Sequence, residues 1–220
     1  QCRATAGFPA ELKAAAKRGA SAVLEVRISQ AASKKEKAVQ GLIEDHVSSG
    51  HKICIFTGRR RDVDRMGEKT AKLHQVKKKN VPIWTAHGGK SATDRQHIVD
   101  DYMIHPGPCI LIATRQSLGE SMNIQDTDAA LFVQLPYTPG ELRQAEGRFA
   151  RLGQERPLVV YFIIAEDTVD EHVASILIDK LDAVETVSQD NELVEAKSVL
   201  AGTEDEEGIL DSILSKMEKE

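Results

Sequence analysis

Two arginines and a glutamine occur at helical spacing in the stretch QAEGRFARLGQ. Arg148 and Arg151 are three residues apart and Gln144 comes one turn before Arg148, so a helix would place all three on one face. A guanidinium group is planar, stays charged and can bind one phosphoryl group through two hydrogen bonds. Two of them on one face therefore predict a site that stabilises charge spreading over a transferred phosphate. Spacing alone leaves a second interpretation open, in which the arginines are solvated or pair with Glu146 or Glu155.

A second candidate, the stretch GGKS at residues 88–91, copies the end of a phosphate-binding loop. That loop needs another glycine five residues before Gly89, where its backbone turns around the phosphates, and this chain has Trp84 there. Ser91 followed by Asp94 instead predicts a helix N-cap with its capping partner. We therefore do not expect this stretch to bind a nucleotide.

The elements that must position these groups are short apolar runs that alternate with helical patterns. The apolar runs cover residues 52–56, 81–84, 109–113, 129–135 and 158–164. The helical patterns cover residues 33–50, 62–78, 92–103, 139–150 and 168–181. This alternation predicts an α/β fold, a parallel sheet with helices on both faces. Ligands of such sheets bind at the carboxyl ends of the strands, so the site is expected in the following loops. These loops are residues 57–61, 85–91, 114–123 and 136–140.

Three parts of the chain are expected from the same pattern. Residues 1–32 contain few regularly spaced apolar residues and predict an irregular leading segment with one helix and one short strand. Residues 33–182 form the main domain, and Ser33 with Glu36 predicts a capping box at its first helix. Residues 183–220 are acidic and helix-permissive, and their apolar stripe is expected to pack on the chain itself or on a partner.

Composition narrows the classes of function. The apolar runs are too short to cross a bilayer and no secretory signal is present, so we expect a soluble protein of the cytoplasm, nucleoid or nucleus. Gln1 in place of Met indicates an excised or processed fragment. The three cysteines lack CxxC spacing and the seven histidines lack an HExxH pattern, so no metal site is expected. The net charge is −5, but basic residues cluster at 59–61 and 77–79 and predict a local positive face.

The stretch QAEGRFARLGQ resembles the last signature motif of superfamily-two helicases, and the trailing Gly153 and Gln154 are typical of Swi/Snf-type DNA translocases. The resemblance implies a C-terminal RecA-like lobe, one half of a two-lobe ATP-driven motor. It also implies that Arg148 and Arg151 reach the γ-phosphate of ATP across the cleft between the lobes. On the same pattern Gln144 lies at the hydrolytic site and Gln154 contributes to nucleotide binding.

The stretch ATRQSLGESMNI resembles the preceding helicase signature, a strand followed by a small-residue loop. The resemblance implies that Thr114 and Arg115 contact nucleic-acid phosphates. It also implies that Gly119, Glu120 and Asn123 couple the nucleotide cleft to the nucleic acid. Small residues suit this role because they let backbone N–H groups approach phosphate. Glu120 stands where the typical loop is richer in glycine, so an ordinary strand-to-helix connection remains the alternative.

Two further stretches, ICIFTGRRRDVDRM and TAHGGKSATDRQHIVDDYM, resemble the opening segments of the same lobe in order and spacing. They imply phosphate contacts by Thr57, Arg59, Arg60 and Lys90. Solvated charges on an ordinary surface are the alternative at each of these positions.

The sequence has no GxxxxGK[ST] motif and no DExH or DEAD stretch to hold Mg²⁺. The chain alone is therefore expected to be inactive as an ATPase, with ATP and Mg²⁺ bound only in a full-length protein whose N-terminal lobe supplies those motifs. The expected partners are that lobe and nucleic acid, double-stranded DNA first, and no membrane. The alternative function is a non-catalytic RecA-like docking module. A small-molecule enzyme has little support, because GxGxxG and a nucleophile elbow are missing.

Overall fold

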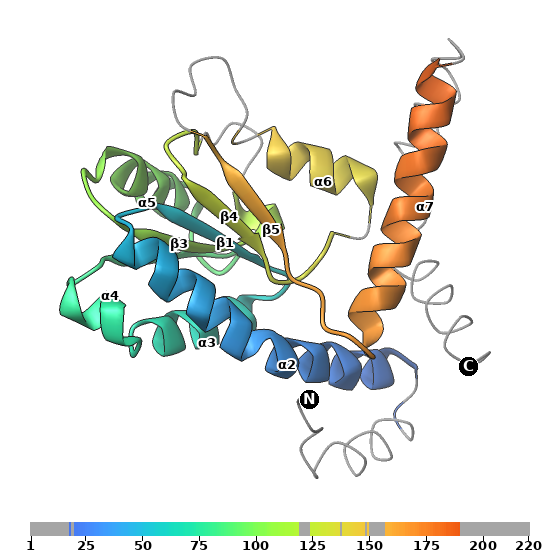
Figure 1. Cartoon of the computed structure of the whole chain (residues 1–220), viewed down its shortest axis with the longest axis horizontal. Helices are drawn as coiled ribbons and strands as arrows, with labels where there is room; N and C mark the ends of the chain where they lie inside the picture. The colour runs from blue at the N-terminus through green and yellow to red at the C-terminus, as the bar shows by residue number, and fades with distance from the viewer. Residues whose placement is uncertain are drawn as a thin grey trace. The chain divides into compact units, whose positions relative to one another are not determined.

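The computed structural model describes residues 18, 20–118, 124–136, 138–147, 149 and 157–189 (Figure 1). The helices are α2 (Ala20–Ser48), α3 (Arg60–Thr70), α4 (His74–Lys78), α5 (Ala92–Ile104), α6 (Pro139–Glu146) and α7 (Val169–Gln189), with a 3-10 turn at Arg115–Ser117. The strands are β1 (Ile53–Thr57), β2 (Ile83–Ala86), β3 (Ile110–Thr114), β4 (Ala129–Phe132) and β5 (Val159–Phe162). The chain forms two compact units. The sheet unit comprises residues 36–134 and 143–163, and the second unit comprises residues 1–35, 135–142 and 164–220.

All five strands of the sheet unit are parallel and lie in the order β2-β3-β1-β4-β5. The chain passes from β1 to β2 on one side, returns through β3, and then crosses to β4 on the other side of β1. In register, Thr57 at the end of β1 pairs with Thr114 of β3, and Phe56 pairs with Phe132 of β4. The carboxyl end of β1 is therefore the point where the strand order reverses, which is the usual ligand position in open α/β sheets.

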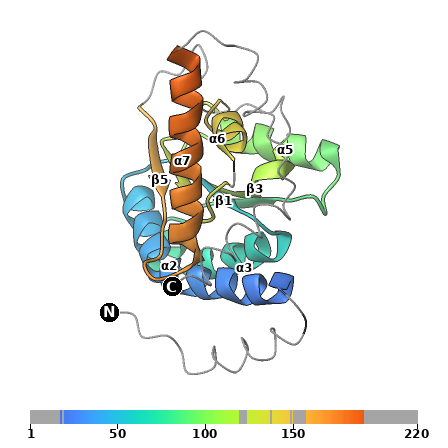
Figure 2. The ribbon, with the colours of Figure 1, turned by 90° about the vertical axis from the view of Figure 1, so that its right-hand side faces the viewer.

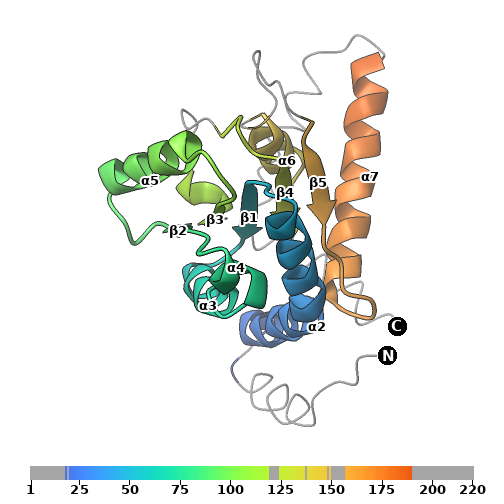
Figure 3. The ribbon, with the colours of Figure 1, turned by 60° about the vertical axis from the view of Figure 1, so that its left-hand side comes forward.

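Hydrophobic residues cover both faces of the sheet because successive side chains of a strand point to opposite sides. Ile53 and Ile55 of β1 pack with buried residues of α2, α3 and α4. Cys54 and Phe56 pack on the opposite face with Val99 and Tyr102 of α5. Figure 3 shows α3 and α4 on one side of the strands and α5 on the other, and Figure 2 shows the same layers from another direction. The predicted α/β fold is confirmed.

The second unit has a small core of its own, in which Ala31 of α2 packs with Val169 and Val173 of α7. Beside it, Lys35 forms a buried ion pair with Asp170 at 2.8 Å. The carboxylate of Asp170 also accepts a hydrogen bond at Oδ2 from the backbone N–H of Ala165, at 3.0 Å. Burial lowers the pKa of Lys35, and the charge of Asp170 opposes that shift. The ion pair therefore joins α2 to the start of α7.

The prediction that a helix begins with a capping box at Ser33 is wrong. Helix α2 begins at Ala20, so Ser33 is an exposed residue inside the helix and does not cap it. Glu36 does not reach back along its own helix either, because its carboxylate pairs with Lys69 at 2.5 Å and with Arg65 at 3.5 Å on α3. A helix therefore continues through residues that were expected to be irregular, since tertiary contacts outweigh the local capping signal.

Two smaller differences concern the segment between β1 and β2. The single helix predicted over residues 62–78 is two helices, α3 and α4, because the chain turns out of the helix at Leu73, whose backbone is extended. Strand β2 begins at Ile83, two residues later than predicted. In the part of the chain that the structure describes, no helix is long and apolar enough to cross a membrane.

Candidate functional site

The described candidate residues lie on three loops at the carboxyl edge of the sheet. Thr57 ends β1 and is followed by Arg59 and Arg60, and Lys90 lies in the loop after β2. Thr114 ends β3 and is followed directly by Arg115. Because the strands are parallel, these three loops share one edge, as expected.

Arg60 and the loop after β2 touch each other at this edge. A Cβ atom at Gly89 would lie 2.5 Å from Arg60 Cζ, so only glycine allows the guanidinium to lie against the loop backbone in this way. The Arg60 side chain is 66% exposed, and its Nε lies 4.0 Å from Asp64 on the next turn of α3. The site thus has one mainly solvated guanidinium beside Gly89, and a solvated guanidinium suits a phosphate.

His87 holds the loop after β2 through a hydrogen bond to its backbone. Its side chain is buried, and its Nδ1 accepts a hydrogen bond from the backbone N–H of Gly89 at 3.1 Å. Its Nε2 lies 3.3 Å from Asp64 Oδ1. The Nδ1 acceptor role places the ring proton on Nε2, facing the carboxylate. His87 therefore links the loop after β2 to α3, and with it to Arg60.

Lys90 and Ser91 complete this loop. Lys90 Nζ donates to Thr85 Oγ1 at 3.2 Å, and the Lys90 carbonyl accepts from Arg95 at 3.4 Å. Ser91 Oγ accepts from the backbone N–H of Asp94 at 3.0 Å, so the predicted N-cap of α5 is confirmed. The stretch GGKS is accordingly a turn and a helix start.

A second set of contacts connects the chain segments that follow β1, β3 and β4. Arg115 donates from its guanidinium to the carbonyl of Gln134 at 3.1 Å, and this bond links the ends of β3 and β4. Gly58 lies against the Gln134 side chain so closely that a Cβ atom there would overlap the amide. Thr57 and Thr114 are only 2% and 8% exposed. The two threonines therefore have little contact with solvent at this edge.

The helix α6 carries the remaining described candidate. Gln144 is exposed on α6, and the helical pattern ends with Gly147 donating to the Arg143 carbonyl at 2.9 Å. Phe149 is buried, and its ring meets Phe56 edge-on at 5.7 Å. The candidates outside the described residues are Arg148, Arg151 and Gln154 of the last motif and Gly119, Glu120 and Asn123 of the preceding loop. Their roles stay predictions.

Sequence analysis did not identify His87 or Asp64 as part of the site. The available signal was weak, since a histidine before two glycines is also an ordinary turn residue. Asp64 follows Arg60 by one helical turn, a spacing that indicates a local ion pair and nothing more. The link between His87 and Asp64 depends on α3 lying beside β2, which local patterns do not reveal.

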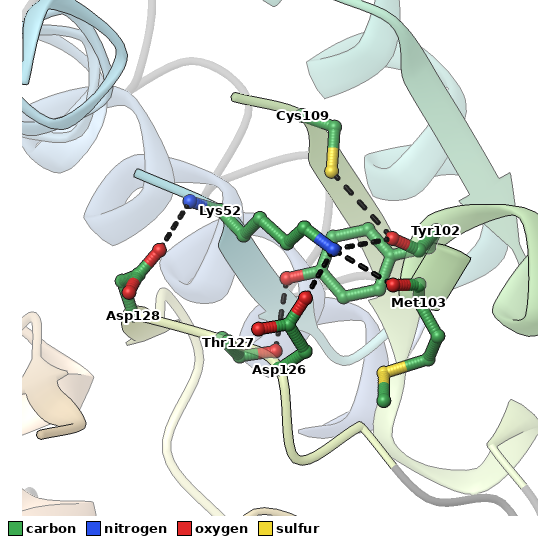
Figure 4. Close-up of polar contacts among 7 residues, drawn as sticks. All are labelled: Lys52, Tyr102, Met103, Cys109, Asp126, Thr127 and Asp128. Atoms are coloured by element: carbon green, nitrogen blue, oxygen red, sulfur yellow. Dashed lines mark hydrogen bonds and ion pairs between the residues drawn. The ribbon is translucent and has the colours of Figure 1, made fainter. Parts of the chain in front are cut away.

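A separate polar cluster lies at the amino ends of the strands (Figure 4). Lys52 precedes β1, and its Nζ donates to the carbonyls of Tyr102 at 3.3 Å and Met103 at 2.8 Å at the end of α5. The same amine forms an ion pair with Asp126, and the backbone N–H of Lys52 donates to Asp128 at 2.8 Å. These contacts join the starts of β1 and β4 to α5.

The two described cysteines are buried and form no disulfide with each other. Cys54 lies in the core, and the Cys109 thiol donates to the Tyr102 carbonyl at 3.8 Å in the amino-end cluster. Burial raises the pKa of Cys109 to about 12, against the opposing charge of Lys52. Among the residues that the structure describes, no three His, Cys, Asp or Glu side chains are grouped so as to hold a metal ion.

Comparison with known proteins also identifies a helicase C-terminal lobe. The family model described as the helicase conserved C-terminal domain matches residues 34–153, more than half of the chain. A SWI/SNF-related matrix-associated actin-dependent regulator of chromatin subfamily A-like protein 1 from Xenopus tropicalis is 26% identical over 151 residues, which are 68% of this chain and 15% of that protein. Protein CHROMATIN REMODELING 19 of Arabidopsis thaliana is 27% identical over 149 residues, 68% of this chain and 19% of that protein.

Two further matches come from a bacterium and from a solved structure. The uncharacterized ATP-dependent helicase YqhH of Bacillus subtilis is 38% identical over 78 residues, 36% of this chain and 14% of that protein. The crystal structure of the C-terminal part of the Fun30 ATPase domain has a TM-score of 0.60 and 19% identity, covering 84% of this chain and 54% of that one. That likeness shows the fold. The chain spans between 14% and 19% of the length of the three protein relatives described here. It belongs to the helicase conserved C-terminal domain family, as a C-terminal RecA-like lobe of the Swi/Snf type of superfamily two.

Proposed function

We propose that this chain is the C-terminal motor lobe of an ATP-dependent DNA translocase. In this proposal the carboxyl edge of the sheet contacts the phosphate backbone of double-stranded DNA, while Arg148 and Arg151 act on ATP held mainly by an N-terminal lobe of the same protein. Relatives named as chromatin regulators and as ATP-dependent helicases support it. They also support a place beside DNA, in the nucleus or the cytoplasm.

The observation that carries the DNA-binding part is the meeting of basic residues from separate loops at one edge. Arg59 and Arg60 follow β1, and Lys90 follows β2. Arg60 lies against Gly89 with its guanidinium mainly solvated, so a phosphate at this edge could accept hydrogen bonds from the guanidinium. Such contacts grip the backbone of DNA without selecting its sequence, which is what movement along a strand requires.

The ATP-dependent part rests on the last motif. A guanidinium that enters the site when the lobes close stabilises the charge on the transferred phosphate, and Gln144 would lie near the hydrolytic water. The chain lacks the phosphate-binding loop and the Mg²⁺-holding carboxylates, so the N-terminal lobe would supply them. Closing on ATP and opening after hydrolysis would then move the DNA-binding edge along the duplex.

The test is the DNA-stimulated ATPase rate of the intact two-lobe protein carrying Arg151→Ala. We expect the catalytic rate to fall at least ~1,000-fold, the effect typical of losing an arginine finger. Arg143→Ala is the matched control, because Arg143 is an exposed arginine of α6 outside the motif. A rate that Arg151→Ala leaves unchanged contradicts the proposal and favours the non-catalytic docking module.

A further inference from the structure

Positive charge is concentrated on a part of the sheet unit beyond the carboxyl edge. Residues 59–80, which include α3 and α4, hold nine Lys or Arg and three Asp or Glu, whereas the whole chain has a net charge of −5. The opposite face differs, since α5 exposes Asp94, Asp100 and Asp101. The sheet unit therefore has a basic segment at α3 and α4 and an acidic helix α5, and Figure 3 shows these helices on opposite sides of the strands.

Several of the basic residues on α3 and α4 have structural tasks. Arg65 and Lys69 both pair with Glu36 of α2. Lys79 donates from Nζ to the carbonyls of Val47 at 2.9 Å and Ser48 at 2.8 Å, and so caps the end of α2. These charges are neutralised or occupied, so they do not explain the excess on this face.

Three lysines are different. The side chains of Lys72, Lys77 and Lys78 are exposed, and none of them makes a hydrogen bond or ion pair with the residues that the structure describes. We call them the lysine track. Their backbone is fixed, because Leu73 and Val76 pack into the core beneath them and the N–H of Val81 donates to the Val76 carbonyl at 3.0 Å. The track thus presents unpaired charge from an ordered element.

We propose that the lysine track is a second contact for the phosphate backbone of duplex DNA, continuing from Arg60 along α3 to Lys77 and Lys78. This inference rests on the proposed function. Helix α3 has 11 residues and spans about 16 Å at 1.5 Å per residue. Lys72 follows α3, and Lys77 and Lys78 lie on α4, the next helix. Because duplex DNA carries one negative charge per ~1.7 Å of its axis, a duplex that crosses both helices would present phosphates to the whole track.

The character of this surface favours a polyanion over a protein partner. Protein interfaces are centred on buried aromatic or aliphatic anchors. None of the large exposed hydrophobic residues in the described ranges lies on α3 or α4; they are Ile104, Val159, Phe162, Ile164 and Ile178. Flexible, strongly hydrated ammonium groups without apolar neighbours suit a phosphate backbone, which needs charge and no pocket.

The experiment measures the affinity of the full chain for a DNA duplex over a range of salt concentrations. Each phosphate contact contributes about 0.9 to the slope of log K against log salt. We expect Lys77→Gln/Lys78→Gln to reduce the magnitude of that slope by about 2 and to weaken binding equally for unrelated sequences. A melting curve that matches the unmodified chain shows that the variant folds.

Asp100→Asn/Asp101→Asn is the matched control, because it also changes the charge by two, on the α5 face. We expect it to leave the salt slope unchanged. An equally large change in slope from this control overturns the proposal. The affinity for DNA would then depend on the net charge of the chain and would not depend on a local contact with the lysines.

Arg60→Gln separates this inference from the proposed function. A smaller slope for Arg60→Gln with an unchanged slope for Lys77→Gln/Lys78→Gln overturns the lysine track alone. Unchanged slopes for both variants overturn the track and the DNA-binding edge together. Reduced slopes for both support both.

Discussion

The two ends of one parallel sheet use positive charge in opposite ways. At the amino ends, Lys52 is 3% exposed and its amine has two carbonyls and Asp126 as partners. At the carboxyl ends, the Arg60 side chain is 66% exposed and its Nε is 4.0 Å from Asp64. A buried charge must be paired to be tolerated, whereas a charge intended for a ligand has to stay solvated until the ligand arrives. The comparison separates charges that hold the fold from those available to bind.

The polar groups of the amino-end cluster are paired with one another because of where α5 ends. Helix α5 ends there with carbonyl groups that have no partner within the helix. Lys52 supplies donors to two of them, those of Tyr102 and Met103, and Asp128 accepts from the Lys52 backbone. Each buried polar group of this set has a partner from a distant part of the chain. Removing the Lys52 amine therefore takes one donor from both carbonyls and from Asp126 at once.

Lys52→Met is the substitution that tests this pairing most strongly. It removes the Lys52 amine from the two α5 carbonyls and from Asp126 while keeping the apolar stem. We expect a loss of about 2–3 kcal/mol in the free energy of unfolding, less than the ~3–5 kcal/mol of a fully buried pair because Asp126 is 36% exposed. Urea denaturation followed by circular dichroism measures it.

The control for Lys52→Met is Lys37→Met, at an exposed lysine of α2. That change should stay within about 0.5 kcal/mol of the unmodified chain. If the two lysine variants unfold at the same urea concentration, the contacts of Lys52 do not stabilise the fold.

The carboxyl end is tested next by Gly89→Ala. A Cβ atom there meets the Arg60 guanidinium at 2.5 Å, the far end of a flexible side chain, so the arginine can move and the fold survives. We expect DNA affinity to fall about ten-fold, equivalent to ~1.4 kcal/mol, because Arg60 is displaced from the loop. Fluorescence anisotropy with a labelled duplex measures the change.

Gly88→Ala provides a close comparison for Gly89→Ala, since a Cβ atom at Gly88 would meet nothing within 4 Å. Its DNA affinity should match that of the unmodified chain. Equal losses in the two variants would mean that the loop backbone matters and that Arg60 does not.

Sequence patterns predicted the parts of this molecule that depend on near neighbours. The apolar strands, the parallel sheet and the Ser91 cap each follow from residues a few positions apart, and the structure confirms them. The same local logic failed at Ser33, because Glu36 has its partners on α3. A capping signal is weak beside a tertiary contact that extends the helix.

The polar clusters were missed for the same reason. Lys52 and Asp126 are 74 residues apart in sequence, and His87 meets Asp64 only because α3 packs beside β2. Local periodicity carries no information on such pairs. The family motifs gave the positions of Arg59, Arg60 and Lys90, which now lie on one edge, but they did not reveal which of these charges is solvated.

The smallest expected effect concerns the hydroxyl pair within the amino-end cluster. Tyr102 and Thr127 are buried, and their side-chain oxygens lie 2.9 Å apart (Figure 4). Burial raises the pKa of Tyr102 well above its ordinary value, so the phenol is neutral and the bond is one between two hydroxyl groups. Tyr102→Phe should cost about 1 kcal/mol of unfolding free energy, because the Thr127 hydroxyl loses its partner inside the protein.

The double variant Tyr102→Phe/Thr127→Val decides whether that cost belongs to the hydrogen bond. Replacing both partners with apolar groups of similar shape leaves no unsatisfied hydroxyl, so the double variant should lose less than the sum of the two single variants by roughly 1 kcal/mol. Strict additivity in the denaturation series would show that the two hydroxyls act independently. In that case only Lys52 and its carboxylate partners stabilise the amino-end cluster. The difference between the two ends of the sheet would then be that charged groups are paired at the amino end and solvated at the carboxyl end.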